Sequence, residues 1–184
     1  MNGKVVKSIR EAISLAGLKD GMTISFHHHL RNGDYVLNLV MEEVARLGIR
    51  DLTVNASSLF DIHLPLLDHI QSHVVTSIQT DYMSAALGRT PIDVAFIAAP
   101  AADPMGNCSG KYGKSACGSL GYAYPDAMYA KKVVVITDNL VDYPLLDWSI
   151  PESYVDYVVC VEEIGNPKGI VSGTTQITRD PVGL

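Results

Sequence analysis

The apolar positions along the chain predict short helices that alternate with short strands rich in valine and isoleucine. Apolar residues spaced three and four positions apart predict helices over 4–16, 35–47, 64–70 and 124–130. Apolar runs bounded by turn residues predict strands over 22–26, 51–55, 74–79, 92–98, 132–137 and 157–162. These runs lack strict alternation of apolar and polar residues, which is typical of a parallel sheet covered on both faces. We therefore expect an α/β fold with an open, mostly parallel sheet and helices on both faces.

Turn and capping residues mark where the predicted elements begin and end. Gly17 is expected to end the first helix in a left-handed conformation, and Asp20 and Gly21 form a tight turn before the first strand. Asp34 is expected to cap the start of the second helix and Gly48 to stop it.

Length and charge narrow the possible classes of function. A chain of 184 residues, 47% of them hydrophobic and 18% charged, fits one globular domain with a buried core. The net charge is −6 and no basic patch is visible, so nucleic acid is not expected as a partner. The apolar runs are too short to cross a bilayer, and the first residues lack the apolar stretch of a signal peptide. We therefore expect a cytoplasmic protein without a membrane contact.

The three cysteines do not form a recognisable chemical motif. Cys108, Cys117 and Cys160 are odd in number and have no CxxC spacing, so neither a disulfide framework nor a metal clamp is indicated. We interpret them as small apolar residues in or near the core.

A polar loop directly follows the first predicted strand and is the clearest functional signal in the chain. It contains His27, His28, His29 and Arg31, and the turn 32–34 leads from it into the next helix. In α/β proteins ligands usually bind between the carboxyl end of a strand and the following helix. Imidazole and guanidinium donors near the free amides of a helix start suit a polycarboxylate or phosphate. A structurally satisfied cluster is the alternative interpretation.

The histidine triplet does not indicate a metal site. Adjacent residues on an extended backbone point to opposite faces, so at most two of the three imidazoles can converge on one ion. No HExxH sequence supports a zinc site. We expect no metal in this chain.

A second candidate loop follows the fourth predicted strand. It lies within 100–120, a glycine-rich segment that is predicted to have no regular structure, and loops of this length are often functional. Gly106 would let a ligand approach the backbone, and Asn107 and Ser109 can form hydrogen bonds with it. The alternative is a surface loop shaped by its turn residues. No Walker A sequence, no GxGxxG after a strand and no GxSxG sequence is present.

Three stretches make the sequence resemble a known family. They are DGMTISFHHHLRNGD at 20–34, IDVAFIAAP at 92–100 and GSLGY at 118–122. On these stretches the chain resembles the N-terminal part of the citrate lyase alpha chains, which are family I CoA-transferases. The family's Ala-Asp-x-x-Gly-Asn pattern is matched at 102–107. The histidine triplet stands where other family I enzymes carry a glycine loop, and this departure resembles the lyase subfamily.

The resemblance implies a CoA-transferase-like fold and the transfer of a carrier thioester from acetate to citrate, which gives a citryl thioester. The thiol would belong to a CoA-like prosthetic group on an acyl-carrier (gamma) subunit, and a beta subunit would cleave the citryl thioester. A homo-oligomer is expected. The residues expected to bind the substrate are His27, His28, His29, Arg31, Asn32, Gly33, Ser57 and Ser58. The residues expected to bind the thioester are Asp103, Gly106, Asn107, Gly118 and Gly121.

The family also implies what this chain does not contain. Its full chains are built from two related α/β halves, and the nucleophilic glutamate is expected in the second. We therefore expect residues 1–184 to form a single N-terminal domain of a longer protein, without a catalytic residue of its own. Glu162 and Glu163 are interpreted as the solvated end of the last predicted strand. A segment that the family carries is expected to be missing near 83–85.

Two other functions remain open on the sequence. A sugar-phosphate isomerase or deaminase-like enzyme has the same kind of open α/β architecture, and Arg31, Lys111 and Lys114 are the cations available to it for phosphate. A non-catalytic binding module of a larger complex is the third possibility.

Overall fold

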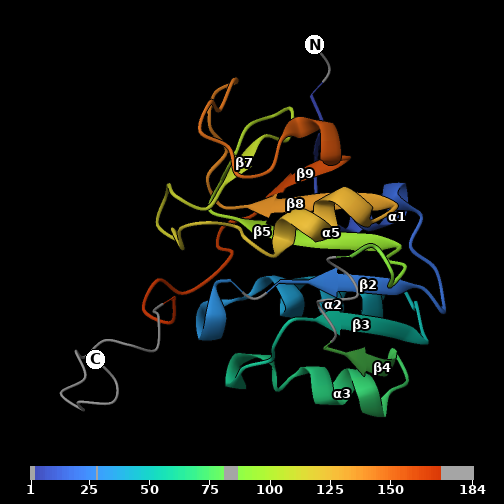
Figure 1. Cartoon of the computed structure of the whole chain (residues 1–184). Coiled ribbons are helices and arrows are strands. Elements are labelled where there is room, and N and C mark those ends of the chain that lie inside the picture. Colours follow the sequence, from blue (N-terminus) through green and yellow to red (C-terminus); the bar gives the residue numbers. More distant parts are fainter. Residues whose placement is uncertain (1–2, 28, 81–86, 171–184) are drawn as a thin grey trace.

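The computed structural model describes residues 3–27, 29–80 and 87–170. At its centre is a seven-stranded sheet with the strand order β1-β9-β8-β5-β2-β3-β4, in which every neighbouring pair is parallel (Figure 1). The strands of this sheet are β1 (Val5–Val6), β2 (Thr23–Phe26), β3 (Leu52–Ala56), β4 (Val75–Gln79), β5 (Val94–Ala99), β8 (Lys132–Thr137) and β9 (Tyr157–Cys160). The α-helices are α1 (Ile9–Ala16), α2 (Val36–Arg46), α3 (Leu66–Gln71) and α5 (Ala123–Tyr129). The short 3₁₀ helices are η1 (Arg31–Gly33), η2 (Asp61–His63) and η3 (Glu152–Tyr154).

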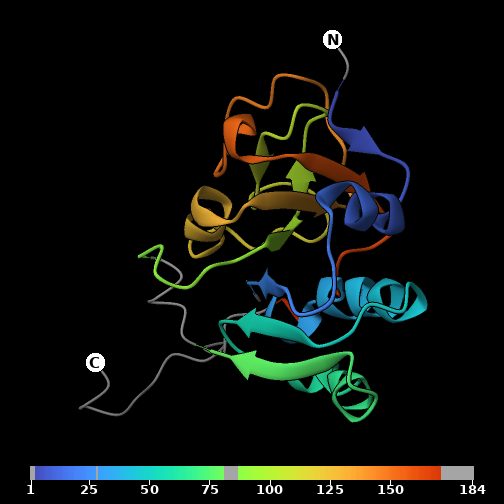
Figure 2. The same cartoon turned by 90° about the vertical axis from the view of Figure 1, so that its right-hand side faces the viewer.

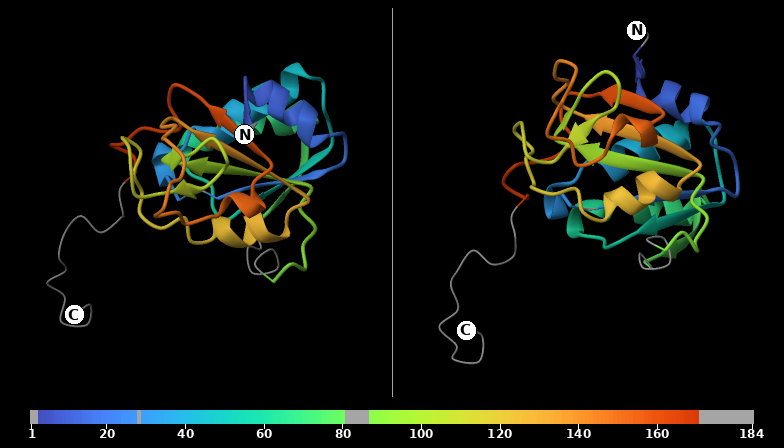
Figure 3. Two further views of the ribbon diagram at one scale, coloured as in Figure 1. Left: turned by 90° about the horizontal axis from the view of Figure 1, so that it is seen from above. Right: turned by 45° about the horizontal axis from the view of Figure 1, so that its top comes forward.

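Helices cover both faces of the sheet, as the sequence predicted. Figure 2 shows α1 and α2 on one side and α5 on the other, and Figure 3 shows the same layers from two further directions. Successive residues of β5 point to opposite faces, so Phe96 packs in the core under α1 and α2 whereas Ile97 packs in the core under α5. All of β5 is buried because the strand lies in the middle of the sheet. This position explains its uninterrupted apolar run.

The first predicted helix is wrong over its first residues. Val5 and Val6 form the edge strand β1, which pairs with Val158 and Val159 of β9. Both valines are β-branched and suit a strand, and the extended backbone of Ser8 separates them from the helix that follows. The apolar spacing alone could not distinguish this two-residue strand from another helical turn.

Two other predictions, one of an unstructured segment and one of a helix cap, are also wrong. The segment 100–120 was expected to have no regular structure, but it contains β6 (Ala101–Ala102) and β7 (Cys108–Ser109), which pair in antiparallel fashion. Asp34 is not the N-cap of α2, because Tyr35 occupies that position. The Asp34 carboxylate still accepts a hydrogen bond of 2.8 Å from the amide of Val36, so it satisfies an amide at the helix start from one residue earlier. Gly17 adopts the left-handed conformation that was predicted for it.

The interpretation that the cysteines lie in or near the core is correct for Cys108 and Cys117 and wrong for Cys160. Cys108 is fully buried in the core under α5, and burial raises the pKa of its thiol far above the usual range. Cys117 is half-buried. Cys160 is exposed, because β9 ends there and the side chain leaves the core.

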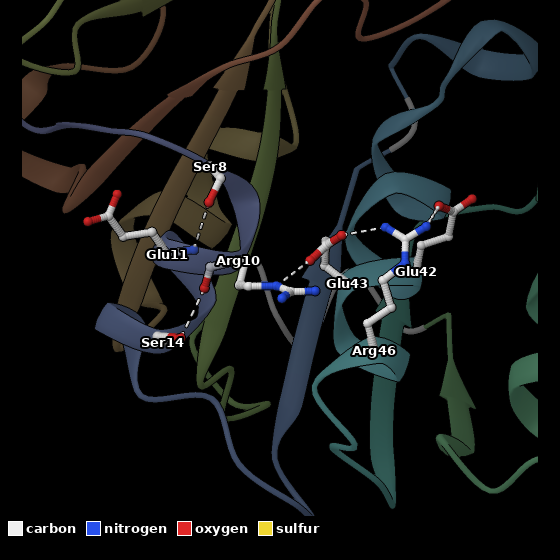
Figure 4. Close-up of polar contacts among 7 residues, drawn as sticks. All are labelled: Ser8, Arg10, Glu11, Ser14, Glu42, Glu43 and Arg46. Atoms are coloured by element: carbon white, nitrogen blue, oxygen red, sulfur yellow. Dashed lines mark hydrogen bonds and ion pairs between the residues drawn. The ribbon is translucent and has the colours of Figure 1, made fainter.

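Helix α1 is fixed at its start by a side-chain cap, and one ion pair in its first turn joins it to α2. Figure 4 shows Arg10 and Arg46 on either side of Glu43. The Arg10 Nε and Glu43 Oε2 atoms are 2.9 Å apart. Hydrogen bonds from Arg46 and Arg10 hold the pKa of Glu43 below its usual value.

Replacing Ser8 with alanine should lower the free energy of unfolding by about 1 kcal/mol, since the Ser8 Oγ accepts a hydrogen bond of 3.1 Å from the Glu11 amide at the helix start. Ser14→Ala is the matched control on the same helix. Its hydroxyl only donates to the Arg10 carbonyl, which already belongs to the helix. That change should stay within about 0.5 kcal/mol in urea unfolding followed by circular dichroism. Equal effects of the two changes would contradict the capping role of Ser8.

Candidate functional site

A cavity of about 480 Å³ opens where β2 and β3 end. The carboxyl ends of the strands lie at the left edge of the sheet in Figure 1, and η1 lies at this edge too. The cavity is lined by His27, His29, Arg31, Ser57, Ser58, Phe60, Cys117, Ser119, Leu120, Gly121, Tyr122 and Ile170. The two polar loops that follow β2 and β3 therefore contribute to one site, as expected for a parallel sheet.

The rings of His27 and His29 are each held by a neighbouring segment. His27 is more than nine-tenths buried, and its Nε2 atom lies 2.9 Å from the Oδ2 atom of Asp126 on α5. The ring also stacks on Tyr122, with 6.3 Å between the ring centroids. The His29 Nε2 atom lies 2.6 Å from the carbonyl oxygen of Ala98 in β5. Because a carbonyl only accepts, this nitrogen of His29 carries a proton.

Arg31 is the cationic side chain of the cavity. Its backbone φ is 53°, a left-handed conformation that is uncommon for a residue with a side chain. The guanidinium forms no ion pair or hydrogen bond with another residue in the described part of the chain. Ser57 and Ser58 line the same cavity just after the end of β3, and both are partly exposed. Arg31 is thus the cavity's free charged donor among the described residues.

Asn32 and Gly33 do not line this cavity. The Asn32 Oδ1 atom accepts a hydrogen bond of 3.1 Å from the Ile62 amide, which ties η1 to η2. A Cβ atom on Gly33 would lie 2.5 Å from the carbonyl oxygen of Asn166, so only glycine lets the two segments approach this closely. Both residues hold the loop that carries Arg31. His28, also expected to bind the substrate, lies outside the described residues.

The side chains of the predicted thioester motif are hydrogen-bonded within the chain. Asp103 is fully buried, and its Oδ1 atom accepts hydrogen bonds from the amides of Met105, Gly106 and Asn107 at 2.9, 2.9 and 3.1 Å. The Asn107 Nδ2 atom donates to Asp103 at 2.9 Å and to the carboxylate of Glu152 at 3.0 Å. None of Asp103, Gly106 and Asn107 lines the cavity. Their assignment to thioester binding stays a prediction.

The glycines of the loop before α5 have different positions. Gly121 lines the cavity, with a φ of 29°, whereas Gly118 does not line it. A Cβ atom on Gly110 would lie 2.0 Å from the Gly118 carbonyl oxygen, so Gly118 takes part in a close backbone contact.

Several charged residues weighed on the sequence lie outside the cavity. Lys111 pairs with Asp147 at 2.9 Å, and Lys114 lies 3.4 Å from Glu163. Neither lysine lines the cavity. Of the three cations considered for binding a sugar phosphate, only Arg31 therefore lies in the described cavity wall. Glu162 and Glu163 are exposed, as expected for the end of a strand.

Sequence reasoning missed part of the cavity wall and the support behind it. The missed lining residues are Phe60, Cys117, Ser119, Leu120, Tyr122 and Ile170. Asp126 was missed as the partner of His27. The stretch GSLGY at 118–122 contains three of these missed residues, Ser119, Leu120 and Tyr122, and was a signal for them, but nothing local marked Asp126.

The described residues contain neither a metal-binding cluster nor a membrane-spanning helix. In 3–27, 29–80 and 87–170 no group of three His, Cys, Asp or Glu side chains is arranged to hold a metal ion. No helix in the same ranges is long and apolar enough to span a membrane.

Cys117 should react slowly with iodoacetamide although it lines the cavity. Burial raises the pKa of its thiol to about 11, so about a thousandth of it is thiolate near pH 8. The rate should rise roughly tenfold for each unit of pH below that value. Mass spectrometry of the digested protein measures this rate, and the exposed Cys160 in the same digest is the internal control. Equal rates for Cys117 and Cys160 at neutral pH would contradict the prediction.

Comparison with known proteins identifies the family. The family model described as "Citrate lyase, alpha subunit (CitF)" matches residues 2–90 and 84–184. The chain belongs to the citrate lyase alpha-subunit family. It is 42% identical over 205 residues to the citrate lyase alpha chain of Haemophilus influenzae, covering 97% of this chain and 41% of that protein. The chain thus spans about two fifths of the length of the curated relatives that it matches.

Solved structures agree with this family and with the predicted fold. A putative citrate lyase alpha subunit from Streptococcus mutans, solved in complex with citrate, has a TM-score of 0.87 and 45% sequence identity, covering 97% of this chain and 40% of that one. Glutaconate coenzyme A-transferase from Acidaminococcus fermentans has a TM-score of 0.61 and 17% identity, covering 91% of this chain and 77% of that one. The second likeness shows that the family shares the CoA-transferase fold. The expected missing segment near 83–85 lies outside the described residues.

Proposed function

We propose that this chain is the carboxylate-binding N-terminal part of a citrate CoA-transferase. The observation that carries the proposal is the charge of the cavity. The protein has a net charge of −6, yet the described cavity wall has no acidic residue and presents Arg31, two imidazoles and serine hydroxyls. Such donors suit a ligand with several carboxylates. The citrate complex of the Streptococcus mutans relative supports the same ligand.

In the proposed reaction, citrate replaces acetate on a carrier-bound thioester, and a citryl thioester and free acetate are formed. The residues of this chain bind and orient the carboxylates of citrate, while the nucleophilic glutamate lies outside these 184 residues. The thiol belongs to a CoA-like group on an acyl-carrier subunit, which acts as a substrate here. Gly121 and Ser119 line the cavity, whereas Asp103 and Asn107 are already hydrogen-bonded within the chain. A complex with carrier and lyase subunits, and a homo-oligomer, belong to this proposal.

Isothermal titration of the intact protein tests the ligand. Citrate should bind, and ribose 5-phosphate, which represents the sugar-phosphate alternative, should not. Citrate should also slow the alkylation of Cys117 without changing that of the exposed Cys160. Incubation of the complete enzyme with acetyl-carrier and citrate should give citryl-carrier, which mass spectrometry detects. Binding of the sugar phosphate without citrate binding would contradict the proposal, and citrate binding without thioester exchange would favour a non-catalytic binding module.

A further inference from the structure

Two asparagines tie the segment that follows β2 to the loop that follows β3. Both backbone polar groups of Ile62, which lies in η2, form hydrogen bonds with asparagine side chains of that segment. The Ile62 amide donates to the Oδ1 atom of Asn32 at 3.1 Å. The Ile62 carbonyl accepts from the Nδ2 atom of Asn38, in the first turn of α2, at 2.8 Å. A donor and an acceptor from one segment therefore hold the other at a single residue.

The ties at Ile62 also fix the part of its loop that lines the cavity. Two hydrogen bonds close the turn 60–63, one from the Phe60 amide to the Nδ1 atom of His63 at 3.1 Å and one from the His63 amide to the Phe60 carbonyl at 2.8 Å. The rings of Phe60 and His63 pack edge to face, with 6.1 Å between their centroids. At its other end the loop leaves Ala56, which is held in the sheet. The serines of the cavity wall lie between these two fixed ends.

The two tied segments carry hydrogen-bond donors on separate walls of the cavity. Arg31 directly precedes Asn32 on the first wall, and Ser57 and Ser58 lie on the second. A ligand with several carboxylates can meet both walls at once, so its affinity depends on how firmly the walls are held relative to each other. A ligand with one carboxylate meets one wall, and it gains nothing from their fixed separation.

We propose that Asn32 and Asn38 are positioning residues that hold the two walls at a fixed separation and thereby increase the preference of the cavity for citrate over acetate. Acetate, the product that leaves in the proposed reaction, has only one carboxylate. Neither asparagine lines the cavity, so both act through the loops that they join. This inference rests on the proposed function, because it places citrate in the cavity.

The test compares the affinities for citrate and acetate in the intact protein. Asn32 is exposed, so Asn32→Ala removes one tie without opening a buried site. In isothermal titration the affinity for citrate should fall about three- to tenfold, the range that one hydrogen bond contributes. The affinity for acetate, measured at constant ionic strength by competition with citrate, should change by less than about twofold, because acetate does not need both walls. Asn38→Leu keeps the approximate size of the side chain, removes the donor and should act in the same way.

Asn139→Ala is the matched control. Asn139 is partly exposed, lies just after β8 and does not line the cavity. The same change of asparagine to alanine at this position should leave both affinities and the melting temperature unchanged.

The outcomes separate the two proposals. Failure of citrate to bind the wild-type protein would overturn the proposed function. Wild-type citrate affinity in Asn32→Ala or in Asn38→Leu would overturn the positioning role and leave the carboxylate site standing. An equal loss of affinity for citrate and acetate would also overturn that role, because it would show general damage to the cavity, and so would a complete lack of competition by acetate in the wild type. If Asn38→Leu does not fold, Asn32→Ala at its exposed position still decides the result.

Discussion

Replacing Asp103 with alanine should lower the free energy of unfolding by about 3 to 5 kcal/mol. The carboxylate is fully buried and accepts hydrogen bonds from the amides of Met105, Gly106, Asn107 and, at 3.0 Å, Leu145. Hydrogen bonds to a charged group are stronger than neutral ones, and alanine would leave these amides without their acceptor. Urea unfolding followed by circular dichroism measures the loss.

Asp142→Ala is the matched control for this prediction. Asp142 is exposed and lies in the same part of the chain as Leu145, so its removal should change stability by less than about 0.5 kcal/mol. The comparison also separates a structural role of the 102–107 motif from a role in thioester binding. If Asp103→Ala keeps the stability of the wild type but loses thioester exchange, the motif contacts the thioester and its structural role is refuted.

Replacing Arg31 with glycine should weaken citrate binding by about ten- to a hundredfold without destabilising the fold. The guanidinium is the free charged donor on the described cavity wall, and a charge-assisted pair with a carboxylate contributes about 1.5 to 3 kcal/mol. Glycine adopts the observed φ of 53° more easily than arginine does, so stability should stay level or rise by up to about 1 kcal/mol. Isothermal titration with citrate and urea unfolding of the same sample measure the two effects.

Two further variants sharpen the result for Arg31. Arg31→Lys keeps the charge but loses the planar, bidentate donor, so it should recover only part of the affinity. Arg50 is an exposed arginine just before the amino end of β3, whereas the cavity lies at the carboxyl ends of the strands. Arg50→Ala should therefore leave citrate binding unchanged. A similar loss in Arg50→Ala and Arg31→Gly would show a general effect of net charge and would contradict a specific role of Arg31.

Local patterns were sufficient for most of the fold. Strand β8 has the predicted bounds of 132–137, because a run of buried β-branched residues between turn signals has few alternative structures. The same patterns placed His27, His29, Arg31, Ser57 and Ser58 after β2 and β3, and the cavity brings all five together. This agreement follows from the parallel sheet, whose strands all end at one edge.

Contacts between distant parts of the chain decided the rest. Val5 and Val6 form a strand only because β9 lies beside them. Gly33 must be a glycine because Asn166 packs against it. In each case the partner belongs to another element, and neither propensity nor spacing encodes the approach of two such segments.

The sequence by itself determined the α/β class, the parallel sheet and the loop in which the candidate ligand-binding residues lie, since periodicity and turn residues act within a few positions of each other. Only the tertiary structure decided what each of those residues does. In the tertiary structure, His27 has a carboxylate partner on α5, Asn32 and Gly33 hold their loop against η2 and Asn166, and Asp103 accepts the hydrogen bonds of a turn. These roles depend on packing between elements far apart in the sequence, because hydrogen bonds form between whichever groups the sheet order brings within reach.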